Sequence, residues 1–160
     1  VIGGGHIPLQ THMTLRWELN ETQAEKEHWF AWEFGRKGSK DALVGEREGT
    51  TMVFKTRSTG RYVHDRDDVP PTLRLVQHTP IQRSNSAFRE IRVSAADDKT
   101  GIERYSARID GEFARIDFDY KRGLLKIILP AQMQRGSHNL RVVCIDGVGN
   151  TSTLESTIEI

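Results

Sequence analysis

The stretch "ERYSARIDGEFARIDFD", Glu103 to Asp119, decides the fold class of this chain. Two strand-like runs, residues 103–110 and 112–119, meet at Asp110-Gly111, a dipeptide that favours the two-residue turn of a β-hairpin. Five further strand-like runs lie on either side of this pair, at residues 72–78, 88–96, 124–129, 138–146 and 152–160. Seven short strands separated by turn residues are typical of an immunoglobulin- or fibronectin-like β-sandwich.

The strand predicted at residues 138–146 carries the only cysteine of the chain. Leu140, Val142 and Cys144 are two residues apart and therefore share one face of this strand. We expect Cys144 to be a buried and unreactive side chain rather than a nucleophile. His138, at the start of the strand, is expected to bind backbone in the preceding turn rather than to act as a base.

The N-terminal part of the chain has the same two-residue period. Apolar residues alternate with polar ones in two segments, first at Met13, Leu15, Trp17 and Leu19, and then at Phe30, Trp32 and Phe34. This spacing predicts a hairpin whose long polar tip spans residues 20–27. The alternative is a short helix over residues 21–33, with Asn20 as its N-cap and Gln23 at the capping-box position.

The next segments lead to a domain boundary. Residues 35–49 predict a loop by composition, and residues 50–64 predict a strand, a break at Gly60 and a short strand. The stretch "DRDDVPPT" follows, and its aspartates and prolines disfavour both a helix and a central strand. We therefore place the boundary near Val69-Pro70, between a strand-rich N-terminal subdomain at 1–69 and the sandwich at 70–160.

Composition excludes several classes of protein. The net charge is only +1, from 23 basic and 22 acidic residues, so there is no concentrated basic region of the kind that binds nucleic acid. No apolar run approaches the roughly 20 residues of a transmembrane helix. One cysteine excludes an intramolecular disulfide framework. Because the chain starts at Val1, without a signal peptide, we expect a processed product or part of a longer protein.

An ordered set of turn and strand residues runs through the second domain. It begins with an aspartate and Pro-Pro, continues as "D…GI..Y…IDG" and an aspartate and lysine after an aromatic strand, and ends as "G.H.L.V…D..GN". The matching positions are Asp68, Pro70, Pro71, Asp98, Gly101, Ile102, Tyr105, Ile109, Asp110, Gly111, Asp119, Lys121, Gly136, His138, Leu140, Val142, Asp146, Gly149 and Asn150. This set resembles the C-terminal region of long lysostaphin-like zinc metallopeptidases of Bacteroidetes, a family of peptidoglycan hydrolases.

The resemblance implies a place in the periplasm or at the outer membrane of a Gram-negative bacterium. The partners it implies are an upstream domain of the same polypeptide or another envelope protein, and peptidoglycan. The zinc site of the family uses a His-x-x-x-Asp and a His-x-His segment. The six histidines here are His6, His12, His28, His64, His78 and His138. His64 has an aspartate four residues later, Asp68, but no pair of histidines forms His-x-His, so the two-segment zinc site is incomplete. The peptidase activity therefore does not carry over, and we expect no cofactor in this chain, zinc belonging to an upstream domain.

The sequence offers two candidate binding sites, a calcium site and an exposed tryptophan. Asp97, Asp98, Asp146 and Asn150 carry oxygen ligands on inter-strand loops that one end of a sandwich brings together, and calcium requires several such oxygens. The more ordinary reading is that these residues fix their own turns, as Asp and Asn commonly do. The second candidate is Trp29, which lies off the Phe30–Trp32 face and is the tryptophan expected to be most exposed for binding a sugar ring or a partner.

The sequence thus predicts an all-β chain that acts as a non-catalytic accessory binding or structural module of a bacterial cell-envelope protein. Two alternatives stay open. One is that the chain is the C-terminal part of an active zinc endopeptidase that cleaves peptidoglycan peptides, and the other is a carbohydrate-binding module.

Overall fold

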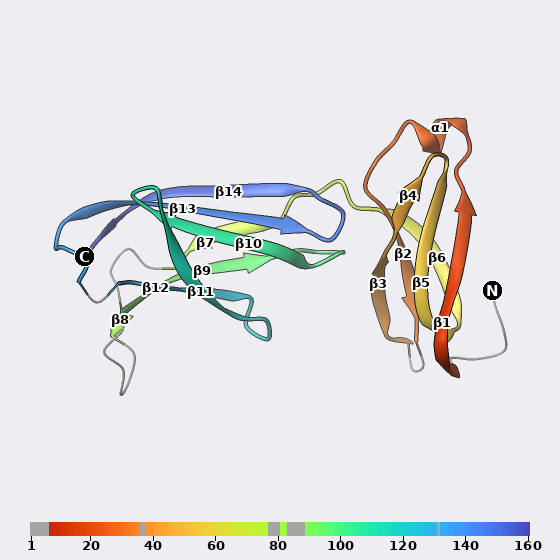
Figure 1. The fold of residues 1–160 in the computed structure, drawn as a ribbon, viewed down its shortest axis with the longest axis horizontal. Coiled ribbons are helices and arrows are strands. Elements are labelled where there is room, and N and C mark those ends of the chain that lie inside the picture. Colours follow the sequence, from red (N-terminus) through yellow and green to blue (C-terminus); the bar gives the residue numbers. More distant parts are fainter. Residues whose placement is uncertain (1–6, 36–37, 77–80, 83–88, 131) are drawn as a thin grey trace. The chain divides into compact units, whose positions relative to one another are not determined.

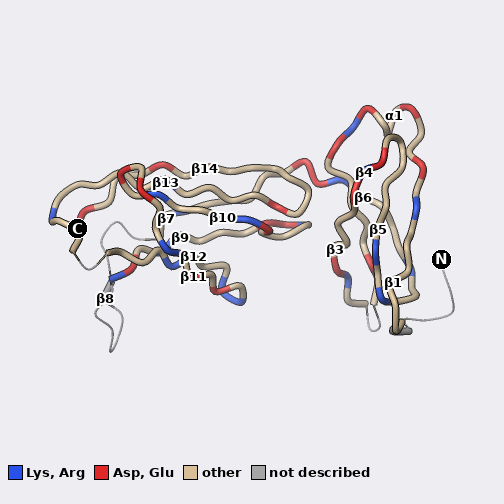
Figure 2. Tube along the Cα trace, in the orientation of Figure 1, with Lys and Arg blue, Asp and Glu red and all other residues tan. Residues whose placement is uncertain are grey.

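The structure is a computed structural model that describes residues 7–35, 38–76, 81–82, 89–130 and 132–160. Antiparallel strands dominate this part of the chain, so the predicted all-β class is confirmed (Figure 1). The chain divides into two compact units, one comprising Val1–Val69 with Gly147–Gly149 and the other Pro70–Asp146 with Asn150–Ile160. In each unit, acidic and basic residues are interspersed along the chain (Figure 2).

The N-terminal unit contains two three-stranded antiparallel sheets. The first has the order β1 (Ile7–Glu18), β5 (Thr51–Thr59) and β4 (Glu46–Glu48). The second has the order β3 (Lys40–Val44), β2 (Trp29–Phe34) and β6 (Arg61–Arg66). A small core joins the two, with Leu19, Ala31, Met52 and Phe54 as its buried members.

The prediction that residues 12–19 and 28–37 pair as a hairpin is wrong. Strand β1 pairs with β5, with Trp17 opposite Met52, whereas β2 pairs with β3 and β6. The polar segment between β1 and β2 holds a one-turn helix, α1 (Glu21–Ala24), whose N-cap Asn20 and Gln23 form the capping box. The alternative helix therefore begins where the sequence predicted but ends at Ala24 instead of residue 33, because the alternating segment from Trp29 is a strand.

The loop predicted over residues 35–49 is also wrong in its second half, where β3 and β4 lie. All three residues of β4 are exposed and charged, which is why the sequence predicted a loop there. β4 is an edge strand whose backbone pairs with β5. Gly45 separates the two strands at a point of close approach. A Cβ there would lie 2.5 Å from Phe54 Cδ1 and 2.7 Å from the Val53 carbonyl oxygen, so a side chain would be excluded.

In the C-terminal unit all seven predicted strands are present. They are β7 (Thr72–Leu75), β9 (Arg89–Ala96), β10 (Ile102–Ile109), β11 (Glu112–Asp119), β12 (Leu124–Ile128), β13 (Ser137–Asp146) and β14 (Thr151–Glu159). A short eighth strand, β8 (Ile81–Gln82), pairs with β9. Residues 77, 78 and 88 of the predicted runs lie outside the described part of the chain.

Strand β11 links the two halves of this unit. Its first residues pair with β10, which continues through β13 to β14, and its later residues pair with β12, which continues through β9 to β7. The change of partner occurs between Ala114, which lies opposite Ala107, and Arg115, which lies opposite Ile128. A strand that passes from one sheet to the other in this way is how a sandwich of antiparallel sheets turns its corners.

The turn predicted at Asp110-Gly111 forms. Ile109 of β10 lies opposite Glu112 of β11, so Asp110 and Gly111 are the two central residues of the hairpin. Both have positive φ, 50° and 88°. This is the backbone of a type I′ turn, which Asp-Gly favours because glycine and aspartate tolerate left-handed conformations.

Apolar side chains from both halves meet in one core. Its fully or nearly fully buried members are Ile91, Val93, Ala95, Ala107, Ile109, Leu125, Ile127, Leu129, Leu140, Val142, Cys144 and Ile158. The faces predicted from alternation at 124–129 and 138–146 are therefore the buried faces of β12 and β13.

Replacing Leu125 by alanine tests this core. Leu125 is 0% exposed and pairs with Val93 of β9, so the cavity left behind should lower the free energy of unfolding by about 2–5 kcal/mol. Phe113, which is 74% exposed, provides the matched control. Phe113→Ala should change the free energy of unfolding by no more than about 0.5 kcal/mol. Urea unfolding followed by far-UV circular dichroism measures both; similar losses in the two variants would contradict the assigned core.

Candidate functional site

The N-terminal unit contains a recess of about 260 Å³ between its strands. Strands β1, β2, β5 and β6 supply its lining, which consists of Leu15, Arg16, Trp17, Ala31, Phe54, Tyr62 and His64. We call the hollow lined by these residues the recess. Its volume is slightly below the range of about 300–1,000 Å³ that is usual for drug-sized ligands, and suits a single ring or one side chain.

The pairing of the strands explains why a hollow is left. On one sheet Leu15 lies opposite Phe54, and on the other Ala31 lies opposite His64. Ala31 is buried, with 4% exposure, and is the smallest residue of the lining. Protein cores are packed densely, so a methyl group at this inward position leaves space that a larger side chain would fill.

An aromatic cluster forms one side of the recess. The ring centroids of Trp17 and His64 are 3.4 Å apart, with the planes inclined by 37°. Trp29 meets the edge of Trp17 at 5.6 Å and 77°. Burial against these rings lowers the pKa of His64 below its usual 6.5, although the charge of Asp65 acts in the opposite direction. The imidazole is therefore predominantly neutral at pH 7.

Polar side chains beside the recess hold Tyr62 in place. The hydroxyl of Tyr62 donates a hydrogen bond of 2.7 Å to the Ser58 carbonyl oxygen. Thr56 Oγ1 donates to the Glu33 carboxylate at 3.1 Å, and Ser58 Oγ donates to the same carboxylate. Thr56 and Ser58 are both buried, so these bonds satisfy polar groups that would otherwise be costly inside the unit. The wall around Tyr62 is thus fixed before any ligand arrives.

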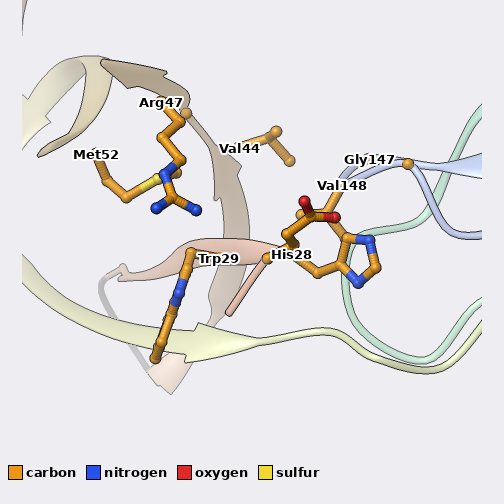
Figure 3. Close-up of a pocket in the computed structure, with 10 residues that line it drawn as sticks. His28, Trp29, Val44, Arg47, Met52, Gly147 and Val148 are labelled. Carbon is orange, nitrogen blue, oxygen red and sulfur yellow. The ribbon is translucent and has the colours of Figure 1, made fainter. Parts of the chain in front are cut away.

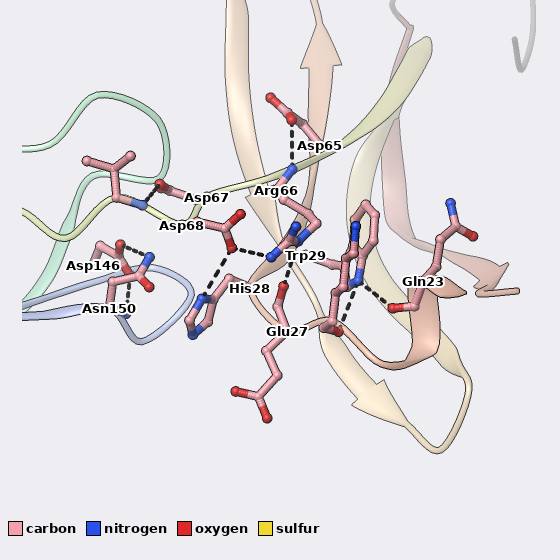
Figure 4. A network of polar contacts seen from close by, with 12 residues as sticks. Gln23, Glu27, His28, Trp29, Asp65, Arg66, Asp67, Asp68, Asp146 and Asn150 are labelled. Carbon is pink, nitrogen blue, oxygen red and sulfur yellow. Dashed lines mark hydrogen bonds and ion pairs between the residues drawn. The ribbon is translucent and has the colours of Figure 1, made fainter. Parts of the chain in front are cut away.

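Trp29, the exposed binding candidate of the sequence, is partly buried in the N-terminal unit. Its indole N–H donates to the carbonyl oxygens of Gln23 at 3.1 Å and Lys26 at 3.2 Å (Figure 4). The Arg66 guanidinium lies 5.6 Å from the ring centroid. These contacts attach α1 and the turn after it to the sheets, so Trp29 supports the recess through Trp17.

Arg47 of β4 reinforces the same end of the unit. Its guanidinium donates to the carbonyl oxygens of Ala24 at 2.5 Å and Lys26 at 3.2 Å, and its Nε donates to the Gly49 carbonyl at 2.8 Å. Figure 3 shows its side chain near those of Trp29 and Met52. Carbonyls at a helix C-terminus attract a cation, so Arg47 closes the end of α1.

The calcium candidates Asp146 and Asn150 bind each other. Asp146, which is 0% exposed, accepts hydrogen bonds from the Asn150 backbone N–H at 2.8 Å and from its side-chain Nδ2 at 2.7 Å (Figure 4). The Asp146 N–H donates to the Asn150 carbonyl oxygen at 3.0 Å. This pattern closes the turn between β13 and β14, as Asp and Asn side chains do in loops.

The other two candidates, Asp97 and Asp98, lie on the loop between β9 and β10. Asp97 accepts hydrogen bonds from the backbone N–H groups of Lys99 at 3.2 Å and Gly101 at 2.7 Å. Asp97 and Asp98 offer carboxylate oxygens within 4.8 Å of each other. The carboxylate of Asp146 is not among the ligand atoms that gather within this distance. The structure therefore does not bring the four predicted ligands together as one set.

Cys144 is fully buried, and desolvation raises the pKa of its thiol to about 11. It is therefore a protonated thiol at neutral pH, whereas a nucleophilic cysteine requires the thiolate.

His138 bridges two loops of the C-terminal unit. Its Nδ1 lies 2.6 Å from Asp110 Oδ2, and its Nε2 lies 3.0 Å from the Gln134 carbonyl oxygen. A carboxylate and a carbonyl both accept, so only the imidazolium, with two N–H groups, donates to both. These bonds raise the pKa of His138 above 6.5, and the bonds from His138 and the Asn139 N–H lower the pKa of Asp110 below 3.8.

Sequence reasoning did not single out Ala31, Phe54, Tyr62 or His64. Tyr62 and His64 are two residues apart in the strand predicted after Gly60, so they could have been assigned to one face. Their meeting with Trp17 could not have been found, because it depends on the pairing of β1 with β5 and of β2 with β6.

No protein-family model matches this chain, and none of the curated proteins matches it in sequence. Among the described residues, no helix is both long and apolar enough to cross a membrane.

The His138 bridge predicts a specific pH dependence of stability. Because its folded pKa is raised, the contribution of His138 is fully present below pH 6.5 and is lost as pH rises through the folded value. Asp110 has a lowered folded pKa, so its contribution is present above pH 3.8 and is lost as pH falls through the folded value. The bridge should therefore stabilise most between these limits.

Urea unfolding of the wild type and His138→Gln over a pH series measures this effect. The difference in unfolding free energy should be greatest in that window and should shrink above it, and an NMR titration should place the His138 pKa above 6.5. A difference that grows with rising pH, or a pKa at or below 6.5, would contradict the doubly hydrogen-bonded imidazolium.

Proposed function

We propose that this chain is a non-catalytic accessory module of a bacterial cell-envelope protein and that it binds a partner through the recess of its N-terminal unit. The partner is an upstream domain of the same polypeptide, another envelope protein, or peptidoglycan. The module would serve a peptidoglycan-directed metallopeptidase or a related protein, in the periplasm or at the outer membrane.

The recess is the observation that carries this proposal. It is a concave surface of about 260 Å³ with mostly apolar walls and a few polar groups, which is the usual composition of a binding site. Its walls are held by hydrogen bonds that involve Tyr62, Thr56 and Trp29. A pre-formed site binds more tightly because little ordering has to be paid for on association.

The environments of Cys144 and His138 support the proposal that the chain is non-catalytic. Cys144 is a buried, protonated thiol, and both ring nitrogens of His138 face hydrogen-bond acceptors of the protein itself. The envelope setting is supported by the ordered set of residues from Asp68 to Asn150 that resembles the metallopeptidase C-terminal region.

Co-sedimentation with isolated bacterial envelope fragments tests this function. The purified chain should be retained by the fragments, and Ala31→Leu, which fills the recess, should lower the retention about tenfold. Tyr120→Ala is the control, since Tyr120 is 68% exposed, belongs to the C-terminal unit and does not line the recess. A parallel incubation with purified peptidoglycan and zinc, followed by analysis of the supernatant, should release no soluble fragments.

Each arm has an outcome that would contradict the proposal. The absence of retention would remove the binding function, and equal retention of the wild type and Ala31→Leu would place binding elsewhere than the recess. The release of soluble peptidoglycan fragments would show that the chain is catalytic.

A further inference from the structure

We infer that the recess of the N-terminal unit binds a neutral aromatic ring that carries one hydrogen-bonding substituent, a phenol being the simplest case. This inference rests on the proposed binding function and specifies its ligand, which among the proposed partners favours a protein over the pyranose chains of peptidoglycan. It follows from the size of the recess, the chemistry of its walls and the small number of its polar groups.

Size limits the ligand to a small molecule or a single side chain. The recess holds about 260 Å³, and Ala31 and Phe54, which are 4% and 2% exposed, line it from the core. A drug-sized ligand would have to displace these core residues, and close-packed interiors resist such overpacking. One six-membered ring with a short substituent needs no such change.

The walls favour an aromatic ring over an aliphatic group. Trp17, Phe54, Tyr62 and His64 all present rings to the recess. Within the same unit, rings already meet edge to face, as Trp17 does with Trp29 at 5.6 Å and Phe30 with Trp32 at 4.9 Å. Edge-to-face and offset contacts at such distances are favourable beyond the burial of apolar area, so an additional ring gains contacts of the same kind.

The charges around the recess disfavour an ionised ligand. Desolvation lowers the pKa of His64, so its ring is predominantly neutral at pH 7 and offers no cation to a carboxylate. Arg16 is already paired with Glu48, at 2.9 Å, on the surface of the unit. An ionised group inside the recess would therefore be desolvated without a compensating charge, which is costly.

The polar groups of the lining suit one substituent. Tyr62 uses its hydroxyl proton for the Ser58 carbonyl, so its oxygen can act only as an acceptor, and it lies beside the hydroxyls of Thr56 at 3.2 Å and Ser58 at 3.1 Å. The neutral imidazole of His64 has one N–H donor and one acceptor nitrogen. A single hydroxyl can satisfy these groups, whereas the several hydroxyls of a pyranose would exceed them and would be buried without partners.

Titration of the whole chain with p-cresol, followed by ligand-observed NMR and calorimetry, tests the inference. We expect one binding site, and we expect Ala31→Leu to weaken binding about tenfold or more because the added side chain occupies the recess. Tyr62→Phe keeps the volume and removes the acceptor, so it should weaken binding about threefold to tenfold. Tyr120→Ala should leave the affinity unchanged.

Three further probes define the ligand class and its source. Benzoate and methyl glucopyranoside should bind at least about tenfold more weakly than p-cresol, because one is charged and the other has many hydroxyls. N-acetyl-tyrosine amide separates the sources. Binding equal to that of p-cresol assigns the ring to a tyrosine side chain of a partner protein, and binding of p-cresol alone assigns it to a free phenol.

Several results would overturn the inference. They are no binding of p-cresol to the wild type, binding that neither Ala31→Leu nor Tyr62→Phe weakens, and tighter binding of benzoate or the glucoside at the recess. Far-UV circular dichroism checks that the variants fold, and if Ala31→Leu does not, Tyr62→Phe decides alone. Retention on envelope fragments without p-cresol binding would reject the ligand class only, whereas loss of both would reject the function as well.

Discussion

In the N-terminal unit, two three-stranded sheets must cover each other's apolar faces, and this packing constraint determines where the recess lies. Each strand turns every second side chain inward, so few residues are available to fill the interior. Met52, Phe54 and Leu19 fill most of it, but the β2 residue that is buried in this core is Ala31. The hollow beside this methyl group, closed by the rings of Trp17 and His64, is therefore a direct consequence of one small residue at one register position.

The contacts around the recess support this hollow in a consistent way. Trp29 and Arg47 attach α1 and its turn to the sheets through backbone carbonyls, and the bonds of Tyr62, Thr56 and Ser58 satisfy the polar groups on the other side. In the C-terminal unit, by contrast, the polar residues act on the turns. Asp146 and Asn150 close one turn, and His138 connects two loops through Asp110 and Gln134.

The sequence predicted the C-terminal unit well because its information is local. Alternation identifies each strand, and Asp110-Gly111 fixes both the position and the type of its turn, so seven strands could be placed within a few residues. The N-terminal unit was less predictable, since β1 pairs with the distant β5 and not with the next strand. Composition also hid β4, whose exposed charged residues read as a loop. The recess depends on these long-range pairings, and so Tyr62 and His64 could not be associated with Trp17 beforehand.

We propose that partners contact the N-terminal recess, while the acidic turns of the C-terminal unit stabilise the fold. Hydrogen–deuterium exchange of the whole chain, with and without envelope fragments, tests this claim most directly. We expect slower exchange in β1, β2 and β6 around Trp17, Ala31 and His64 when the fragments are present. Protection confined to the loops at residues 97–101 or 147–150, or protection in neither unit, would contradict it.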